Sequence, residues 1–338
     1  MTTIAAPATP VSRELLRTFV FSAYDLQLLR IQTGLRLCAN FRNKLKKDEV
    51  DEVASEDEVE TKDGLTAEAQ SIIDDLTESY KRLTDGVARN RTLPAESGFT
   101  GDALITTYTE LVLVNQYIQI EKNETQQFRQ FENVLSQFKI YETYLKDQIG
   151  IGPALAAVLI AYLDPYKADH ISSFWMYCGL DVAPDGRGRS RRAEHLIDRE
   201  YTNKAGQTAT RKSVTYQPWL KSRLLGVMAG SFLRVKDSPW RVHYDNYKHR
   251  MLTDPARRKV TSAEYKALHK VDPEAARNVW PPLRVHRASM RYMVKMFLAE
   301  FWVKWREVEG LPVTPTYAEA KLGHIHGSGL PDQPQPSL

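Results

Sequence analysis

Apolar residues recur every three or four positions over long stretches of the chain, which is the spacing of helices rather than strands. The first stretch follows Ser12, a residue suited to cap a helix, and ends near Asn43. A second helix is predicted over residues 66–89, and a third helical stretch covers residues 102–148. The third stretch fits one long helix or two, packed against the second or in a coiled coil with another chain. A coiled coil would make the protein a homo-oligomer.

A glycine-containing turn, Ile149-Gly-Ile-Gly-Pro153, follows this stretch and precedes a second apolar helix. Glycine permits positive φ and close backbone approach, and Pro153 suits the first position of the next helix. Unpaired amides at that helix start would attract phosphate. The pattern is typical of a helix-hairpin-helix motif, with Gly150, Ile151 and Gly152 against a DNA backbone. The alternative is an ordinary corner between two helices.

The second half of the chain continues with helical patterns, which makes the predicted fold class mainly α. Ser172 or Ser173 is expected to cap a short helix that ends at Gly179. The other predicted helices cover residues 218–235 and 287–308, with a small helix beginning at Thr261 or Ser262.

Charge is distributed unevenly, although the net charge of the whole chain is only +4. Residues 48–63 carry nine carboxylates against Lys62, which predicts a solvated linker. From Gly186 to Lys259, eighteen basic residues face six acidic ones, a net charge of +12. A basic excess of this size beside a glycine turn favours a polyanionic partner, above all DNA. The alternative is a solubilising cationic surface.

Candidate phosphate contacts are the basic residues that surround the turn in sequence or form a stripe on the last helix. They are Arg187, Arg189, Arg191, Arg192, Lys212, Lys221, Arg223, Arg287 and Arg291. A stripe of Arg284, Arg287, Arg291 and Lys295 follows helical spacing.

Cys38 and Cys178 are the only cysteines, which excludes a disulfide framework and a cysteine-based zinc site. The chain shows neither a signal-peptide pattern nor an apolar run of membrane-spanning length, so we expect a cytoplasmic protein without membrane contact. His324 and His326 form an isolated His-x-His in the tail, which we interpret as incidental. No metal site is predicted.

The order of blocks from Leu145 to Tyr317 resembles the C-terminal transposase domain of insertion-sequence elements of the DEDD/serine, bridge-RNA-guided family. The matching blocks are the glycine turn with its Ala/Leu-rich helix, Ser173-Phe-Trp-Met-Tyr-Cys-Gly-Leu180 with Pro184, the basic loop, and the last helix closed by Gly310-Leu-Pro312. The resemblance covers about half of the chain. It implies DNA binding and DNA transposition or recombination of a mobile element, and a guide RNA as a further partner.

Two departures from this family concern catalysis. The N-terminal half shows helices and an acidic linker instead of the nuclease-like domain with its acidic tetrad. Asp185-Gly186 stands where the family carries its nucleophilic Ser-Gly. Ser190 is the nearest hydroxyl and is flanked by arginines, so it is the candidate nucleophile, and Mg²⁺ is the cofactor to expect if the protein is catalytic. Alternatively, Ser190 is a polar residue of a flexible loop.

The sequence therefore predicts a helical or coiled-coil N-terminal region followed by a helix-hairpin-helix-containing DNA-binding domain. The competing function is that of a non-catalytic, helical nucleic-acid-binding protein. The expected divisions are an N-terminal helix (1–47), an acidic linker (48–65), long helices (66–143), a transposase-like domain (144–317) and a disordered tail (318–338).

Overall fold

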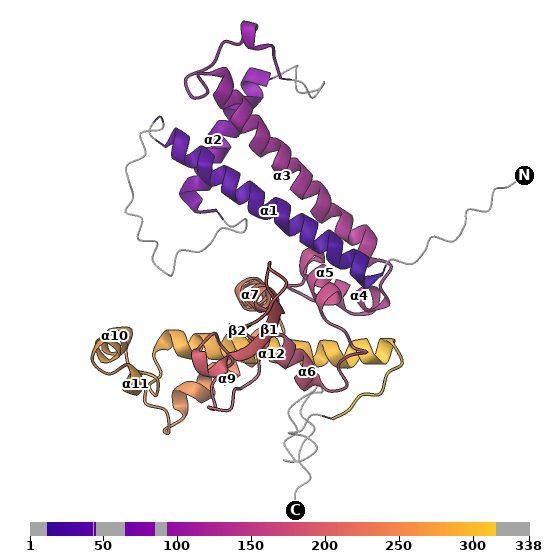
Figure 1. Ribbon diagram of the computed structural model, residues 1–338, viewed down its shortest axis with the longest axis vertical. Helices are drawn as coiled ribbons and strands as arrows, with labels where there is room; N and C mark the ends of the chain where they lie inside the picture. The colour runs from indigo at the N-terminus through magenta and orange to yellow at the C-terminus, as the bar shows by residue number, and fades with distance from the viewer. Residues whose placement is uncertain (1–11, 43, 45–64, 85–92, 316–338) are drawn as a thin grey trace, which may run out of the picture. The chain divides into compact units, whose positions relative to one another are not determined.

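The computed structural model describes residues 12–42, 44, 65–84 and 93–315, and it is mainly helical, as predicted. The chain divides between Val134 and Leu135 into two compact units (Figure 1). This division precedes the expected boundary at 143/144. The acidic linker apart from Leu65, the tail and the His324/His326 pair lie outside the described residues.

Three helices form the N-terminal unit: α1 (Arg13–Phe41), α2 (Ala67–Thr84) and α3 (Tyr108–Leu135). A short 3-10 turn, η2 (Glu96–Gly98), lies between α2 and α3. The Ser12 hydroxyl accepts a hydrogen bond from the Leu15 amide, which confirms the predicted cap. The apolar sides of the helices meet in one core that includes Leu37, Phe41, Ile72, Leu76, Val114 and Tyr117.

The stretch expected to be helical up to Gln148 ends much earlier. Helix α3 stops at Leu135, and only α4 (Lys139–Thr143) and the 3-10 turn η3 (Leu145–Asp147) follow it. Apolar spacing continues through this region because Ile140, Tyr141 and Leu145 are buried in the second unit.

The C-terminal unit is built around α12 (Pro282–Val308), which packs along α9 (Arg241–Thr253) and α6 (Ile171–Tyr177) (Figure 1). Aromatic rings of α12 form its core with Phe232 and Trp240. The remaining elements are α5 (Pro153–Tyr162), η4 (Ala193–His195), β1 (Ile197–Thr202), β2 (Thr208–Ser213), α7 (Pro218–Ser222), η5 (Arg223–Met228), α8 (Ala229–Arg234), α10 (Ser262–Val271) and α11 (Pro273–Ala276).

The structure confirms two local predictions and contradicts a third. The helix expected over 218–235 is present, with one π-helical turn at η5. Thr261 caps α10 through a capping box with Glu264. The cap of α6 was predicted incorrectly, because His170 occupies that position and Ser172 and Ser173 lie inside the helix.

Helix α12 begins at Pro282, five residues before its expected start at Arg287, because proline suits the first turn. Among the described helices, none combines the length and apolar character needed to cross a bilayer.

Candidate nucleic-acid interface

The arginine-rich run after Leu180 forms a folded turn in the structure. A β-bridge joins Val182 to Gly188, and the Ala183 amide donates to the Arg187 carbonyl at 2.7 Å. Gly186 makes the turn with a φ of +74°, a conformation that side chains disfavour. We call residues 181–196 the basic loop. Its fold brings polar groups from different positions of the loop together.

Ser190, His195 and Asp185 form a hydrogen-bonded chain within the basic loop. The Ser190 hydroxyl lies 2.9 Å from His195 Nδ1, and His195 Nε2 lies 3.0 Å from an Asp185 carboxylate oxygen. The Ser190 amide also donates to Nδ1, so Nδ1 is the unprotonated nitrogen and Nε2–H donates to Asp185. His195 is only 2% exposed. These hydrogen bonds therefore fix one tautomer and one orientation of the His195 imidazole.

The charge on Asp185 is stabilised within this chain. The hydrogen bond from His195, together with the Arg187 amide, holds the pKa of Asp185 below its ordinary value despite some desolvation. A carboxylate, an imidazole and a hydroxyl in this order form the arrangement by which hydrolases activate serine. Here the two ring nitrogens exchange the roles they have in serine proteases. The same contacts also stabilise the fold of the loop, so geometry alone supports both interpretations.

Two cations of this loop lie near four from α7 and α12, and we call Arg187, Arg192, Lys221, Arg284, Arg287 and Arg291 the basic cluster. Arg187 donates to the side-chain oxygen of Asn278 at 3.1 Å. Gly188 lies so close to Arg291 that an added Cβ would be 3.1 Å from a guanidinium nitrogen. These contacts place the loop against the arginines of α12.

Burial and neighbouring positive charges lower the pKa values of three cluster residues. Burial lowers the pKa of Arg284, and Arg187 and Arg192 lower it further. Burial, Arg287 and Arg192 act in the same way on Arg291. Burial and the charge of Arg291 lower the pKa of Lys221 to about 8. Burial and neighbouring cations thus destabilise the charged forms of Arg284, Arg291 and Lys221, and an anion placed among them would relieve the repulsion.

Carboxylate partners for the cluster are scarce. Within the described ranges, no carboxylate forms an ion pair with Arg284, Arg287 or Arg291, and Arg192 approaches Asp185 only at 4.0 Å. The Nε of Arg291 is buried without a hydrogen-bond partner. Arg284 instead donates to two backbone carbonyls and stacks on the Trp280 ring. Because leaving partly buried cations unpaired is costly, this arrangement would be stabilised by an external anion.

Several basic residues predicted to contact phosphate have other surroundings. Arg189 turns inward and pairs with Asp181 at 2.7 Å. Lys212 lies on strand β2 and pairs with Asp198 at 2.8 Å. Arg223 lies over the ring of Trp219, and Lys295 of the expected stripe packs its amine on Trp175. Arg191 is exposed on the loop.

The glycine turn packs against another part of the protein, at Ser231 and Phe232. The Gly150 carbonyl accepts a hydrogen bond from the Ser231 hydroxyl at 2.8 Å, and a Cβ on Gly150 would be 2.8 Å from the Phe232 ring. Gly150 has a φ of +91°, and Pro153 begins α5, as predicted. Only the 3-10 turn η3 and the short α4 precede the turn, in place of the long first helix expected. Gly152 is exposed, and phosphate binding there remains a prediction.

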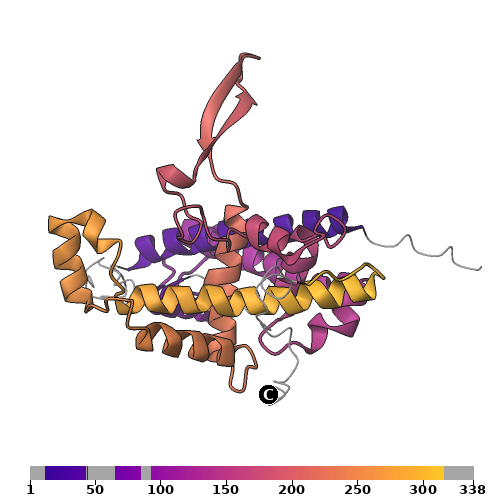
Figure 2. The ribbon, with the colours of Figure 1, turned by 90° about the horizontal axis from the view of Figure 1, so that it is seen from below.

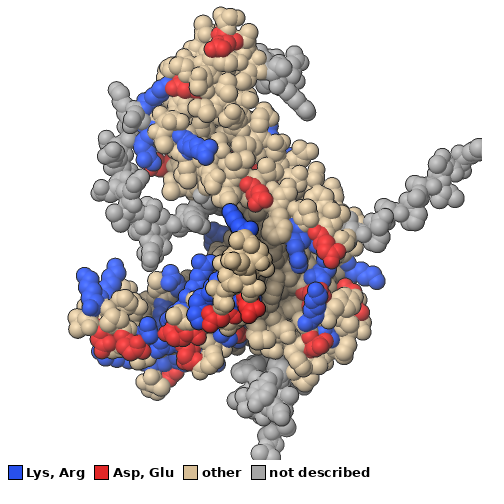
Figure 3. Space-filling view, in the orientation of Figure 1, with Lys and Arg blue, Asp and Glu red and all other residues tan. Residues whose placement is uncertain are grey.

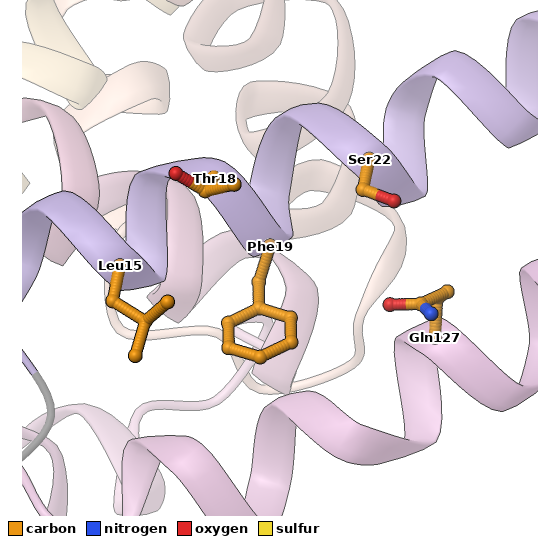
Figure 4. Close-up of a pocket in the computed structure, with 5 residues that line it drawn as sticks. All are labelled: Leu15, Thr18, Phe19, Ser22 and Gln127. Carbon is orange, nitrogen blue, oxygen red and sulfur yellow. The ribbon is translucent and has the colours of Figure 1, made fainter.

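Two further features of the described residues bear on catalytic and metal sites. A hollow of about 170 Å³ lies between α1 and α3, lined by Leu15, Thr18, Phe19, Ser22 and Gln127 (Figure 4). It contains no ionisable side chain, so it is no catalytic candidate. Among the described residues, no three His, Cys, Asp or Glu side chains gather in a way that could hold a metal ion.

Comparison with known proteins does not extend this picture, since no family model, no curated protein and no solved structure matches the chain. The assignment of a function therefore depends on the basic loop and the basic cluster. Sequence reasoning had included five of the six cluster residues as candidate phosphate contacts, and Arg284 only as part of the basic stripe on the last helix. It missed His195 entirely.

Proposed function

We propose that the C-terminal unit binds DNA through its phosphate backbone, as a transposase-like module of a mobile element. The observation that carries this proposal is the basic cluster, which gathers six cations with few carboxylate partners around one loop. Figure 3 shows basic side chains gathered on this unit between the β-hairpin and α10–α11, with acidic side chains beside them. Phosphate oxygens would supply the missing anions.

The resemblance of residues 145–317 to transposase domains supports DNA as the polyanion. In that family the nucleophilic serine lies where this chain has Asp185. Asp185 here is linked through His195 to Ser190, so both positions belong to one hydrogen-bonded chain. The Ser190 hydroxyl therefore lies in the same loop as the position at which that family carries its nucleophile.

Arg192 and Arg287 provide the test of DNA binding, because both are exposed and neither is needed for packing. We expect the double variant Arg192→Ala/Arg287→Ala to bind a mixed-sequence duplex at least about tenfold more weakly, with a salt slope reduced by about 2. Arg241→Ala is the matched control, because Arg241 is exposed and pairs with Asp245. Fluorescence anisotropy over a salt series measures both quantities. A wild-type protein without affinity for DNA at low salt would refute the proposal.

A second candidate function is strand cleavage by Ser190, which the Ser190–His195–Asp185 chain favours. The Ser190 oxygen would form a bond to phosphorus while the bond from phosphorus to the departing deoxyribose oxygen breaks. The serine proton would pass to His195 Nδ1 and then to the departing oxygen. Asp185 would stabilise the protonated imidazole, and the arginines would stabilise charge on the phosphoryl oxygens. The product is a covalent protein–DNA ester.

Covalent adducts on DNA that carries element ends test this second function, with Mg²⁺ present. We expect Ser190→Ala to abolish the adduct and His195→Asn to reduce it by at least about a hundredfold. Ser190→Ala should keep the DNA affinity of the wild type, because it leaves the His195–Asp185 hydrogen bond and the basic cluster in place. Tight binding by the wild type without any adduct would identify the chain as a non-catalytic nucleic-acid-binding protein.

A further inference from the structure

The strands β1 and β2 form a hairpin that projects from the helices of its own unit (Figure 2). All six residues of β1 are exposed, and so are four of the six on β2. The turn follows Asn203, whose side chain accepts from two backbone amides, and Gly206 has a φ of +76°. An isolated two-stranded hairpin is only marginally stable in water. A partner that covers one of its faces would stabilise it.

The register separates two chemically different faces. Alternate residues point to opposite sides of a strand, so the pairs Arg199–Arg211 and Tyr201–Ala209 share one face. We call this the arginine face. The pair Asp198–Lys212 lies on the other face and forms an ion pair at 2.8 Å. Glu200 shares that second face, opposite Thr210.

Two like charges directly opposite each other destabilise a strand pair, and Arg199 and Arg211 are such a pair. In the part of the chain that the structure describes, neither guanidinium pairs with a carboxylate. Arg211 lies over the Tyr201 ring, with 5.1 Å to the ring centroid. On the opposite face, Asp198 and Lys212 form a cross-strand ion pair, whereas the arginine face of the described hairpin lacks a carboxylate of this kind. The arginine face therefore complements an external anion.

From these observations we infer that the hairpin inserts into the major groove of duplex DNA, with Arg199, Tyr201 and Arg211 facing the nucleic acid. The inference rests on the proposed DNA binding and adds a second contact to it. The major groove of B-DNA is wide enough to admit a two-stranded ribbon, whereas that of A-form RNA is deep and narrow. Strand β1 begins two residues after His195, so the hairpin extends directly from the basic loop.

Adjacent residues of β2 provide a matched pair of variants. Arg211 and Lys212 are both exposed and cationic, but they point to opposite faces. We expect Arg211→Ala to weaken binding to a mixed-sequence DNA duplex at least about fivefold and to lower the salt slope by about 1. Lys212→Ala should leave both values close to wild type. Tryptophan fluorescence during urea unfolding verifies that both variants fold, because all six tryptophans lie in the C-terminal unit.

The outcomes separate this inference from the proposal on which it rests. If the wild type fails to bind DNA, the proposed function is wrong. If the wild type binds and Arg211→Ala equals Lys212→Ala, only the hairpin inference is overturned. Duplex RNA of the same sequence is the second arm: an equal loss for Arg211→Ala on RNA would also overturn groove insertion. Amide exchange of residues 197–213 should slow on DNA, and unchanged exchange would contradict the inference.

Discussion

The N-terminal unit and the basic cluster of the C-terminal unit differ in how their charges are paired. In the N-terminal unit, Arg30 and Glu124 are buried together as an ion pair, and Lys44 pairs with Glu110. Asp102 receives hydrogen bonds from Ser79 and from two backbone amides. In the C-terminal unit, the basic cluster gathers cations, and burial together with neighbouring arginines lowers the pKa values of Arg284 and Arg291.

Under the proposed function, this contrast separates charges that serve folding from charges that serve binding. A buried charge that has its partner within the chain contributes to a defined fold, and removing that partner is costly. A cation held near other cations lowers stability, and an anion bound among them would offset this cost. We therefore expect variants of the N-terminal unit to affect stability, and variants of the basic cluster to affect DNA affinity.

The largest effect is expected from Glu124→Leu, which leaves Arg30 buried without its carboxylate. The free energy of unfolding of the N-terminal unit should fall by about 3–5 kcal/mol. Urea unfolding followed by far-UV circular dichroism reports both units. Tryptophan fluorescence reports only the C-terminal unit, because the N-terminal unit contains no tryptophan. The fluorescence transition and the DNA affinity should therefore stay unchanged.

The double variant Arg30→Met/Glu124→Leu is the control for this experiment. It replaces both charges with apolar side chains of similar length, so most of the lost stability should return. A double variant as unstable as Glu124→Leu would show that the pair acts through packing rather than charge. A fall in DNA affinity in either variant would contradict the expectation that charges of the N-terminal unit affect stability alone.

A smaller effect on the same unit is expected from acid. Desolvation opposes ionisation of Asp102, but hydrogen bonds from Ser79, Ile105 and Leu104 lower its pKa from 3.8 to about 2. A lowered carboxyl pKa stabilises the fold above pH 3.8, and this stability is lost as the pH falls from there towards 2. The shift corresponds to about 2 kcal/mol. Circular dichroism should show Asp102→Asn less stable at neutral pH, with a flatter acid dependence in this window.

Helices could be predicted from the sequence where apolar spacing, caps and breakers agree. Ser12 caps α1, Thr261 caps α10, and Pro153 begins α5 at the expected place. The end of α3 at Leu135 could not be predicted, since the apolar spacing continues into a different unit. The hairpin was missed because both of its faces are exposed, so its strands lack the alternation of apolar and polar residues that identifies a half-buried strand.

The site could be predicted only in part, because the positions of basic residues in the sequence do not show which of them lie close together in the fold. Arg187, Arg192 and Arg291 were candidates from their positions in the sequence and gather in the structure. Lys212 belonged to the same basic span but pairs with Asp198 on the hairpin. His195 carried no signal, since its importance arises from a turn that brings Asp185 and Ser190 to opposite nitrogens of one ring.

The smallest and most specific effect is expected from the pH dependence of Lys221. Its amine donates to the Arg189 carbonyl and lies 4.4 Å from the centroid of the Tyr216 ring. Burial and the charge of Arg291 lower its pKa to about 8. Between pH 7 and 9 the amine therefore loses its charge in the folded protein. DNA affinity at constant salt should fall by about threefold to tenfold over this range, because one cation of the cluster is neutralised.

Stability should change in the opposite direction. The unfolded chain keeps the lysine protonated up to about pH 10.4, so it binds more protons than the folded state above pH 8. The free energy of unfolding of the C-terminal unit therefore rises from pH 8 towards pH 10, as tryptophan fluorescence can measure. Lys221→Arg keeps its charge throughout and should abolish the fall in affinity, which also excludes the terminal amine as its source. A lysine with a purely structural role would change stability alone, and its affinity for DNA would be equal at pH 7 and pH 9.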